Sequence, residues 1–109
     1  MLPEVIDAVK GRAKIAVDGS FSRGSDIVKA ICLGADWVGL GRLYCYGLAA
    51  AGAAGIERVV ELLEEEMKEA MGLLGVTSLK QLDKSFISAA TPTNPPGVHS
   101  AFPLMHEGY

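Results

Sequence analysis

Two short apolar runs, separated by one helical segment and each followed by a glycine-containing loop, constrain the fold of this chain most strongly. The runs are Lys14–Val17 and Trp37–Leu40, and the segment between them, Ser25–Leu33, has the spacing of an amphipathic helix. Strand, loop, helix and strand in this order are typical of a parallel βαβ crossover. The sequence therefore predicts an α/β fold in which both strands are buried on both faces.

The loop after each predicted strand combines glycine with arginine. Asp18–Gly24 follows the first strand, and Gly41-Arg42 follows the second. Because the carboxyl ends of parallel strands meet at one edge of a sheet, we expect the two loops to lie side by side. Exposed backbone N–H groups, a helix N-terminus behind the loop and a nearby guanidinium favour an anion site, most naturally one for phosphate.

Asp18 stands where the first predicted strand ends. In an α/β sheet or barrel, a side chain at this position points into the mouth of the site. An Asx turn or an ordinary loop carboxylate explains the residue equally well from the local pattern. The local pattern leaves both interpretations open.

Helices are predicted on both sides of this unit. Leu2–Val9 has an apolar face and a proline in its first turn, Leu43–Gly52 is small and apolar, and Gly55–Leu74 has the clearest helical spacing. No metal site is predicted on the long helix, because its charged residues are interpreted as a solvated face. They are Glu57, Arg58, Glu61, Glu64, Glu65, Lys68 and Glu69.

A capping box at residues 78–81 predicts a short final helix. We place one domain of βα units over residues 1–84 and an extended, proline-rich C-terminal tail over residues 85–109. The tail contains His99 and His106, which are interpreted as surface or packing residues.

Charge and hydropathy exclude several classes of partner. The 109 residues carry a net charge of −3 with no basic block, which argues against nucleic acid as a partner. No uncharged apolar run is long enough to cross a bilayer, so membrane insertion is not expected.

Cys32 and Cys45 are the only cysteines. Both are interpreted as small buried hydrophobic residues, and their scarcity suggests a reducing compartment. The predicted location is therefore cytoplasmic.

The motifs of the two loops and of the helix between them resemble those of a known enzyme family. Asp18–Ala30, Leu33–Asp36 and Gly39–Arg42 together resemble the C-terminal signature of the FMN-dependent α-hydroxy-acid dehydrogenases and oxidases. The similarity continues through residues 46–50, the long helix, residues 75–79 and residues 100–104, and so covers nearly the whole chain. The resemblance implies a C-terminal fragment of a (β/α)8 TIM barrel: its last two strands, the flanking helices and the C-terminal tail.

The resemblance also implies roles for individual residues. Asp18 would bind the ribityl chain of FMN, and the backbone around Gly19 and Ser20, with Gly41 and Arg42, would hold the phosphate. The full set of cofactor-binding candidates is Asp18, Gly19, Ser20, Ser22, Arg23, Gly41 and Arg42.

Two of these positions depart from the family pattern. The family usually has a glycine where Ser20 stands and an arginine where Ser22 stands. One charge-assisted contact to the phosphate is therefore missing, and Arg23 stands beside the gap.

The catalytic motif of the family is absent from the sequence. The S-x-H-G-x-R motif, which supplies the base and a substrate-binding arginine, does not occur in the chain, so no catalytic residue is assigned. In an intact family enzyme, a histidine removes a proton from a small 2-hydroxy acid and FMN accepts the hydride equivalent. We expect this chain to contribute the FMN loops, to bind FMN weakly or not at all alone, and to have no activity by itself.

Three functional hypotheses stay open. The chain is a fragment of such an oxidoreductase, a stand-alone flavin- or phosphate-binding module, or a structural piece without a ligand. Because two strands cannot close a barrel, we also expect a homo-oligomer or association with an N-terminal fragment.

Overall fold

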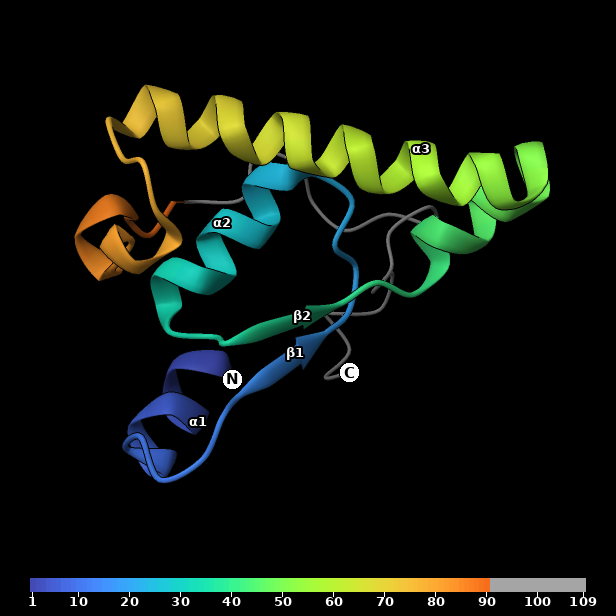
Figure 1. The fold of residues 1–109 in the computed structure, drawn as a ribbon. Helices are drawn as coiled ribbons and strands as arrows, with labels where there is room; N and C mark the ends of the chain where they lie inside the picture. Colours follow the sequence, from blue (N-terminus) through green and yellow to red (C-terminus); the bar gives the residue numbers. More distant parts are fainter. Residues whose placement is uncertain (91–109) are drawn as a thin grey trace.

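The computed structural model describes residues 1–90 of the chain. Most of the predicted tail, with His99 and His106, lies outside the described residues. The elements in order are α1 (Leu2–Val9), β1 (Ala16–Asp18), α2 (Gly24–Leu33), β2 (Trp37–Gly39), α3 (Arg42–Leu74) and two 3₁₀ turns at Leu79–Gln81 and Lys84–Phe86 (Figure 1).

The predicted βαβ crossover is confirmed. β1 and β2 pair in parallel, with Ala16 opposite Trp37 and Asp18 opposite Gly39. The pairing starts two residues later than the apolar run, at Ala16. Just before it, the Asp36 carboxylate pairs with Lys14 Nζ at 2.6 Å and accepts a hydrogen bond from the Ile15 N–H at 2.9 Å. These two contacts tie the start of β1 to the segment that leads into β2.

The prediction that both strands are buried on both faces is wrong for this structure. The side chains of β1 and β2 are exposed or half-buried, and Trp37 is 67% exposed. α2 lies between the sheet and α3 and covers one face of the strands only (Figure 1). In the described part of the chain, no further strand lies beside either edge. The apolar residues of the two strands therefore suit a sheet with more strands and helices packed against it than residues 1–90 provide.

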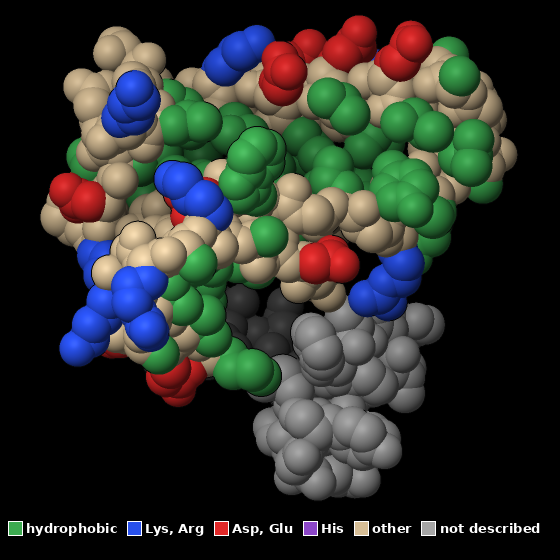
Figure 2. All heavy atoms as spheres, turned by 60° about the horizontal axis from the view of Figure 1, so that its bottom comes forward, with side chains coloured by type: hydrophobic (Ala, Val, Ile, Leu, Met, Phe, Trp, Pro, Cys, Tyr) green, Lys and Arg blue, Asp and Glu red, His purple; other side chains and the backbone are tan. Residues whose placement is uncertain are grey.

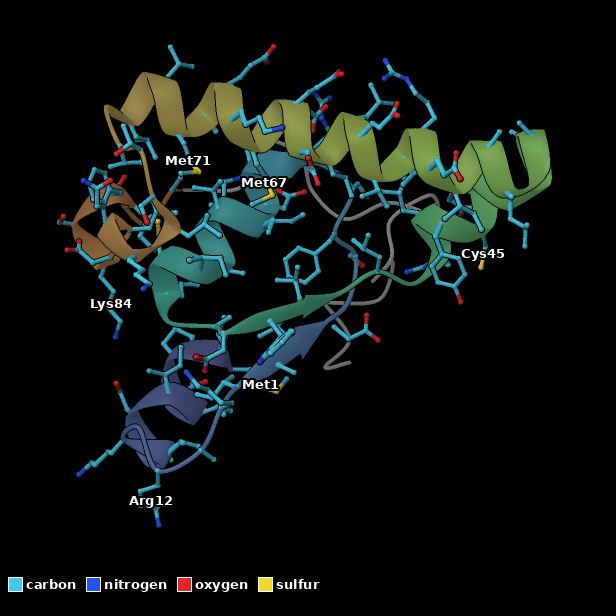
Figure 3. All side chains as sticks on the ribbon, in the orientation of Figure 1. Met1, Arg12, Cys45, Met67, Met71 and Lys84 are labelled. Atoms are coloured by element: carbon cyan, nitrogen blue, oxygen red, sulfur yellow. The ribbon has the colours of Figure 1, made fainter. Side chains whose placement is uncertain are left out.

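The core lies between α2 and α3 rather than around the sheet. The helical spacing predicts a buried stripe of Ile27, Val28, Ala30 and Ile31. The structure buries the first three together with Cys32, while Ile31 is half-buried against the same core. Val28 and Cys32 pack with residues that follow α3, and Met67 and Met71 approach them from α3 (Figure 3). Helix packing therefore holds the crossover in place.

α3 contains a sharp break where two separate helices are predicted. Ala51 and Gly52 leave the helical conformation, and Gly52 has φ +61°. The first part of α3 folds back there, so that Gly47 and Gly55 touch backbone to backbone and a Cβ on either would collide with the other. Because of this break, the long second part of α3 runs back over α2 (Figure 1).

The two cysteines differ in environment. Cys32 is buried, and burial raises the pKa of its thiol. Cys45 is exposed on the first part of α3 (Figure 3), so the prediction that both are buried is wrong for Cys45. The short stretch of α3 before the break has solvent on one side, which the local apolar sequence did not reveal.

Two further features concern the ends and the surface. The capping box at residues 78–81 is confirmed, because the Gln81 side chain accepts the Ser78 N–H at 2.9 Å, but it starts only the 3₁₀ turn Leu79–Gln81. Among residues 1–90, no helix combines the length and apolar character that a membrane span requires. Figure 2 shows broad areas of hydrophobic side chains at the surface of one face.

Candidate functional site

The carboxyl ends of the two strands lie side by side, as predicted. Asp18, the last residue of β1, is opposite Gly39, the last residue of β2. A Cβ on Gly39 would lie 3.3 Å from the Asp18 carboxyl carbon, and one on Gly41 would lie 4.0 Å from Asp18 Oδ1. The absence of a side chain at Gly39 leaves room for the Asp18 carboxylate, which lies near the start of the second loop.

A polar hollow of about 210 Å³ lies between the two loops. It is lined by Ser20, Phe21, Ser22, Gly41, Arg42, Leu43 and Tyr46. The lining offers hydroxyls, a guanidinium and backbone N–H groups, and no carboxylate belongs to it within residues 1–90. This set of donors fits an anion of the size of a phosphoryl group.

The first loop reaches the hollow through an unusual backbone conformation. Gly19 has φ +127° and Ser20 has φ +56°. A positive φ is open to glycine but costs a residue with a side chain about 1 kcal/mol or more. The loop therefore needs contacts elsewhere that hold it in this shape.

The N-terminus of α3 opens on the hollow. Arg42 and Leu43 of its first turn line the hollow together with Gly41, which precedes the helix. Within the described residues, no side chain caps this end of the helix. Its first backbone N–H groups and the positive end of its dipole are therefore directed to the site.

The N–H groups at the N-terminus of α2, which were expected from the sequence to help bind an anion, are bound by carboxylates of the chain. The Asp26 carboxylate accepts the Arg23 N–H at 3.2 Å, and Glu66 on α3 accepts the Gly24 N–H at 2.7 Å. The other oxygen of Glu66 pairs with Arg23 Nε at 2.8 Å. The N–H groups of Arg23 and Gly24 at this helix end are therefore already hydrogen-bonded to carboxylates of the chain and are not available to an anionic ligand.

The seven predicted site residues therefore divide into groups. Ser20, Ser22, Gly41 and Arg42 line the hollow. Asp18 lies at its edge, and Gly19 shapes the loop that reaches it. Arg23 does not line the hollow, because its guanidinium pairs with Glu66.

Sequence reasoning did not include four further residues of this region, Phe21, Leu43, Tyr46 and Glu66, among the site residues. Phe21, Leu43 and Tyr46 also line the hollow. Tyr46 lies one helical turn after Arg42, and this spacing could have indicated it. Glu66 follows Leu63 by three positions and so falls on the inward side of α3. It was assigned from the sequence neither to the solvated face nor to the site, and this spacing could have indicated it.

Comparison with known proteins gives the family. The family model described as FMN-dependent dehydrogenase matches residues 1–89. The chain belongs to this family.

Relatives of established name agree with this assignment. The chain is 44% identical over 86 residues to an L-lactate oxidase of Nostoc sp., a match that covers 79% of this chain and 24% of the relative. It is 46% identical over 90 residues to an L-lactate dehydrogenase of Xanthomonas euvesicatoria, covering 83% and 23% respectively. Human 2-hydroxyacid oxidase 1 is 40% identical over 87 residues, covering 80% and 24%.

Solved structures match as well. Mandelate oxidase with benzoyl-formic acid superposes with a TM-score of 0.72 at 44% identity, over 75% of this chain and 24% of that one. A flavocytochrome b2 variant with sulfite bound gives a TM-score of 0.77 at 36% identity, over 99% of this chain and 29% of that one. The predicted fold class is confirmed, since these neighbours are TIM-barrel flavoenzymes. The chain spans about a quarter of the length of the relatives it matches.

Proposed function

We propose that this chain supplies the phosphate and ribityl end of the FMN site of an FMN-dependent 2-hydroxy-acid oxidoreductase. The observation that carries the proposal is the polar hollow between the ends of β1 and β2, lined by donors from both loops. Mandelate oxidase structures matched by this chain include two with FMN adducts.

The chemistry of the two sides of the site suits the two parts of such a ligand. Arg42 and the open N-terminus of α3 supply positive charge and N–H donors, which suit a phosphate. The Asp18 carboxylate at the edge of the hollow can only accept hydrogen bonds when ionised, which suits a hydroxyl of the ribityl chain.

The chain alone is expected to have no turnover. FMN, when bound, would accept the hydride equivalent from the hydroxy acid. The reaction also needs a base for the substrate hydroxyl, and the S-x-H-G-x-R motif that supplies it in this family does not occur in the sequence. Residues 1–90 contain no histidine.

The exposed strand faces support a second part of the proposal, association with the remaining barrel or with another copy of this chain. Trp37 on β2 is largely exposed, and both edges of the two-stranded sheet are open within residues 1–90. An open strand edge with apolar side chains favours pairing with further strands. Light scattering of the purified chain at micromolar concentration should give a mass above that of a monomer.

The ligand is tested by titrating the purified chain with FMN and with riboflavin, which lacks the phosphate, while following flavin fluorescence. FMN should bind more tightly by about 10-fold or more, because charge-assisted hydrogen bonds to the phosphate contribute about 1.5–3 kcal/mol. Equal affinities would contradict the proposal and favour a structural piece without a ligand.

Activity is tested separately with lactate, glycolate and mandelate as substrates. No turnover is expected from the purified chain in the presence of FMN. Turnover would show that the chain contains a base that its sequence does not reveal.

A further inference from the structure

The loop between β1 and α2 is held from behind by one side chain of α3. Glu66 contacts the two residues at which this loop passes into the helix. One carboxylate oxygen accepts the Gly24 N–H at 2.7 Å, and the other pairs with Arg23 Nε at 2.8 Å. The side chain of Glu66 is only 28% exposed, and its hydrogen bond with the Gly24 N–H is part-buried. The Arg23 side chain is 70% exposed, so the ion pair lies on the solvent side of this joint.

The backbone at this point is also in direct contact with α3. A Cβ on Gly24 would lie 2.5 Å from the Met67 nitrogen and 2.6 Å from the Leu63 carbonyl oxygen. Gly24 therefore rests on the α3 backbone, and Glu66 fixes it there by a hydrogen bond. The end of the loop has little freedom to move.

The other side of the loop faces the hollow. Ser22 lines the hollow of about 210 Å³ on one side. The same residue lines a smaller cavity of about 100 Å³ on the other, together with Glu66 and Leu63. The loop thus forms a thin wall between the anion hollow and the carboxylate that holds it.

The shape of the loop makes this support necessary. Ser20 keeps a positive φ, a conformation that relaxes unless surrounding contacts fix it. At its start the loop is fixed by the pairing of β1 with β2, and at its end by Glu66.

We propose that Glu66 is a positioning residue for the anion site: it holds Arg23 and Gly24 against α3 and thereby sets the loop that lines the hollow. This inference rests on the proposed function, in which the hollow takes the FMN phosphate. Glu66 itself does not touch the ligand.

The test compares Glu66→Ala, Glu66→Gln and the control Glu69→Ala, which alters an exposed glutamate of the same helix. Each variant is titrated with FMN and with riboflavin at a temperature where circular dichroism shows it folded. Glu66→Ala should weaken FMN binding by about 10-fold, the lower end of the effect seen when an outer-shell group of a metal site is removed, and should leave riboflavin binding within about 2-fold.

Glu66→Gln and Glu69→Ala should both stay close to the unaltered chain. The glutamine keeps an oxygen that accepts the Gly24 N–H, so it should retain most of the FMN affinity. A purely structural role for Glu66 predicts an equal loss for both flavins, and a role limited to shielding Arg23 predicts tighter FMN binding in Glu66→Ala. Either result would overturn the inference.

The same data separate failure of the inference from failure of the proposed function. If the unaltered chain prefers FMN and Glu66→Ala prefers it equally, the phosphate site stands and the role of Glu66 is refuted. If the unaltered chain shows no preference for FMN over riboflavin, both are refuted. Should Glu66→Ala fail to fold, hydrogen exchange of the amides of residues 20–23 in Arg23→Ala decides, with Glu66→Gln as the conservative reference. Faster exchange than in the unaltered chain is expected for Arg23→Ala, and unchanged protection contradicts the proposal.

Discussion

Helices α2 and α3 each follow a strand and begin beside an arginine, yet they differ in what binds the N–H groups at their N-termini. At α2, the carboxylates of Asp26 and Glu66 already bind the Arg23 and Gly24 N–H groups. At α3, no side chain of residues 1–90 caps the helix, and Arg42 lines a polar hollow.

The difference arises from what packs behind each loop. α2 is covered by α3, which brings a glutamate to its N-terminus. The start of α3 lies at the edge of the structure, where its first part folds back at Gly52. Similar local sequences thus give one structural joint and one candidate ligand site, and four experiments can break or sharpen this contrast.

Alanine at the two helix starts should have very different effects on stability. Gly24→Ala places a Cβ within 2.6 Å of the α3 backbone, and such overpacking should lower the free energy of unfolding by about 3 kcal/mol. Gly41→Ala meets only Asp18 Oδ1, at 4.0 Å, and should cost less than about 1 kcal/mol. Urea unfolding of both variants measures the two losses, and equal losses would contradict the structural role assigned to the α2 joint.

The two arginines should differ in their effect on the ligand. Arg42→Ala removes the guanidinium that lines the hollow and should weaken FMN binding by about 10- to 100-fold, the equivalent of a charge-assisted hydrogen bond. Arg23→Ala should weaken it by only about 2- to 3-fold, because that side chain is paired with Glu66. Titration with FMN measures both; a larger loss for Arg23→Ala would reverse the assignment.

Adding a charge to the hollow should strengthen binding. Ser22 lines the hollow where the family usually has an arginine, so Ser22→Arg should tighten FMN binding by about 3- to 10-fold through a restored charged contact. Ser25→Arg adds the same charge on α2 outside the lining of the hollow and is the matched control. An equal gain in the control would show only a general electrostatic attraction.

The smallest effect concerns pH. The Gly24 N–H, followed by Arg23, holds the pKa of Glu66 below its usual 4.5. A carboxylate with a lowered pKa stabilises the fold above the unfolded value, and this contribution is lost as pH falls through the folded value. The stability difference between the unaltered chain and Glu66→Gln should therefore be present at pH 7 and shrink below pH 4.5. Urea unfolding at both ends of this range tests it, and a constant difference would mean that the ionised form is not the one stabilised.

Much of the fold could be predicted because local patterns decide it. The helical stripe around Val28 and the break near Gly52 are properties of neighbouring residues, and both occur in the structure. The meeting of Asp18 with the second loop follows from parallel pairing alone. These features need no knowledge of distant parts of the chain.

The remaining features depend on distant parts of the chain or on further strands. No residue close to Arg23 in the sequence indicates that it would pair with the distant Glu66. Arg23 was therefore predicted to be a cofactor-binding residue. The strand around Val17 was predicted as buried because a short run rich in branched residues suits a parallel sheet covered on both faces, while residues 1–90 provide only two strands. Local sequence thus describes the whole barrel better than it describes the isolated piece.

The exposed side chain of Trp37 provides an optical signal for completion of the barrel. It is the only tryptophan of the chain, and it stands on β2 with most of its surface in water. An indole that leaves water for an apolar contact shifts its emission to shorter wavelength. Intrinsic fluorescence would therefore report directly when another segment of polypeptide comes to lie over the open sheet.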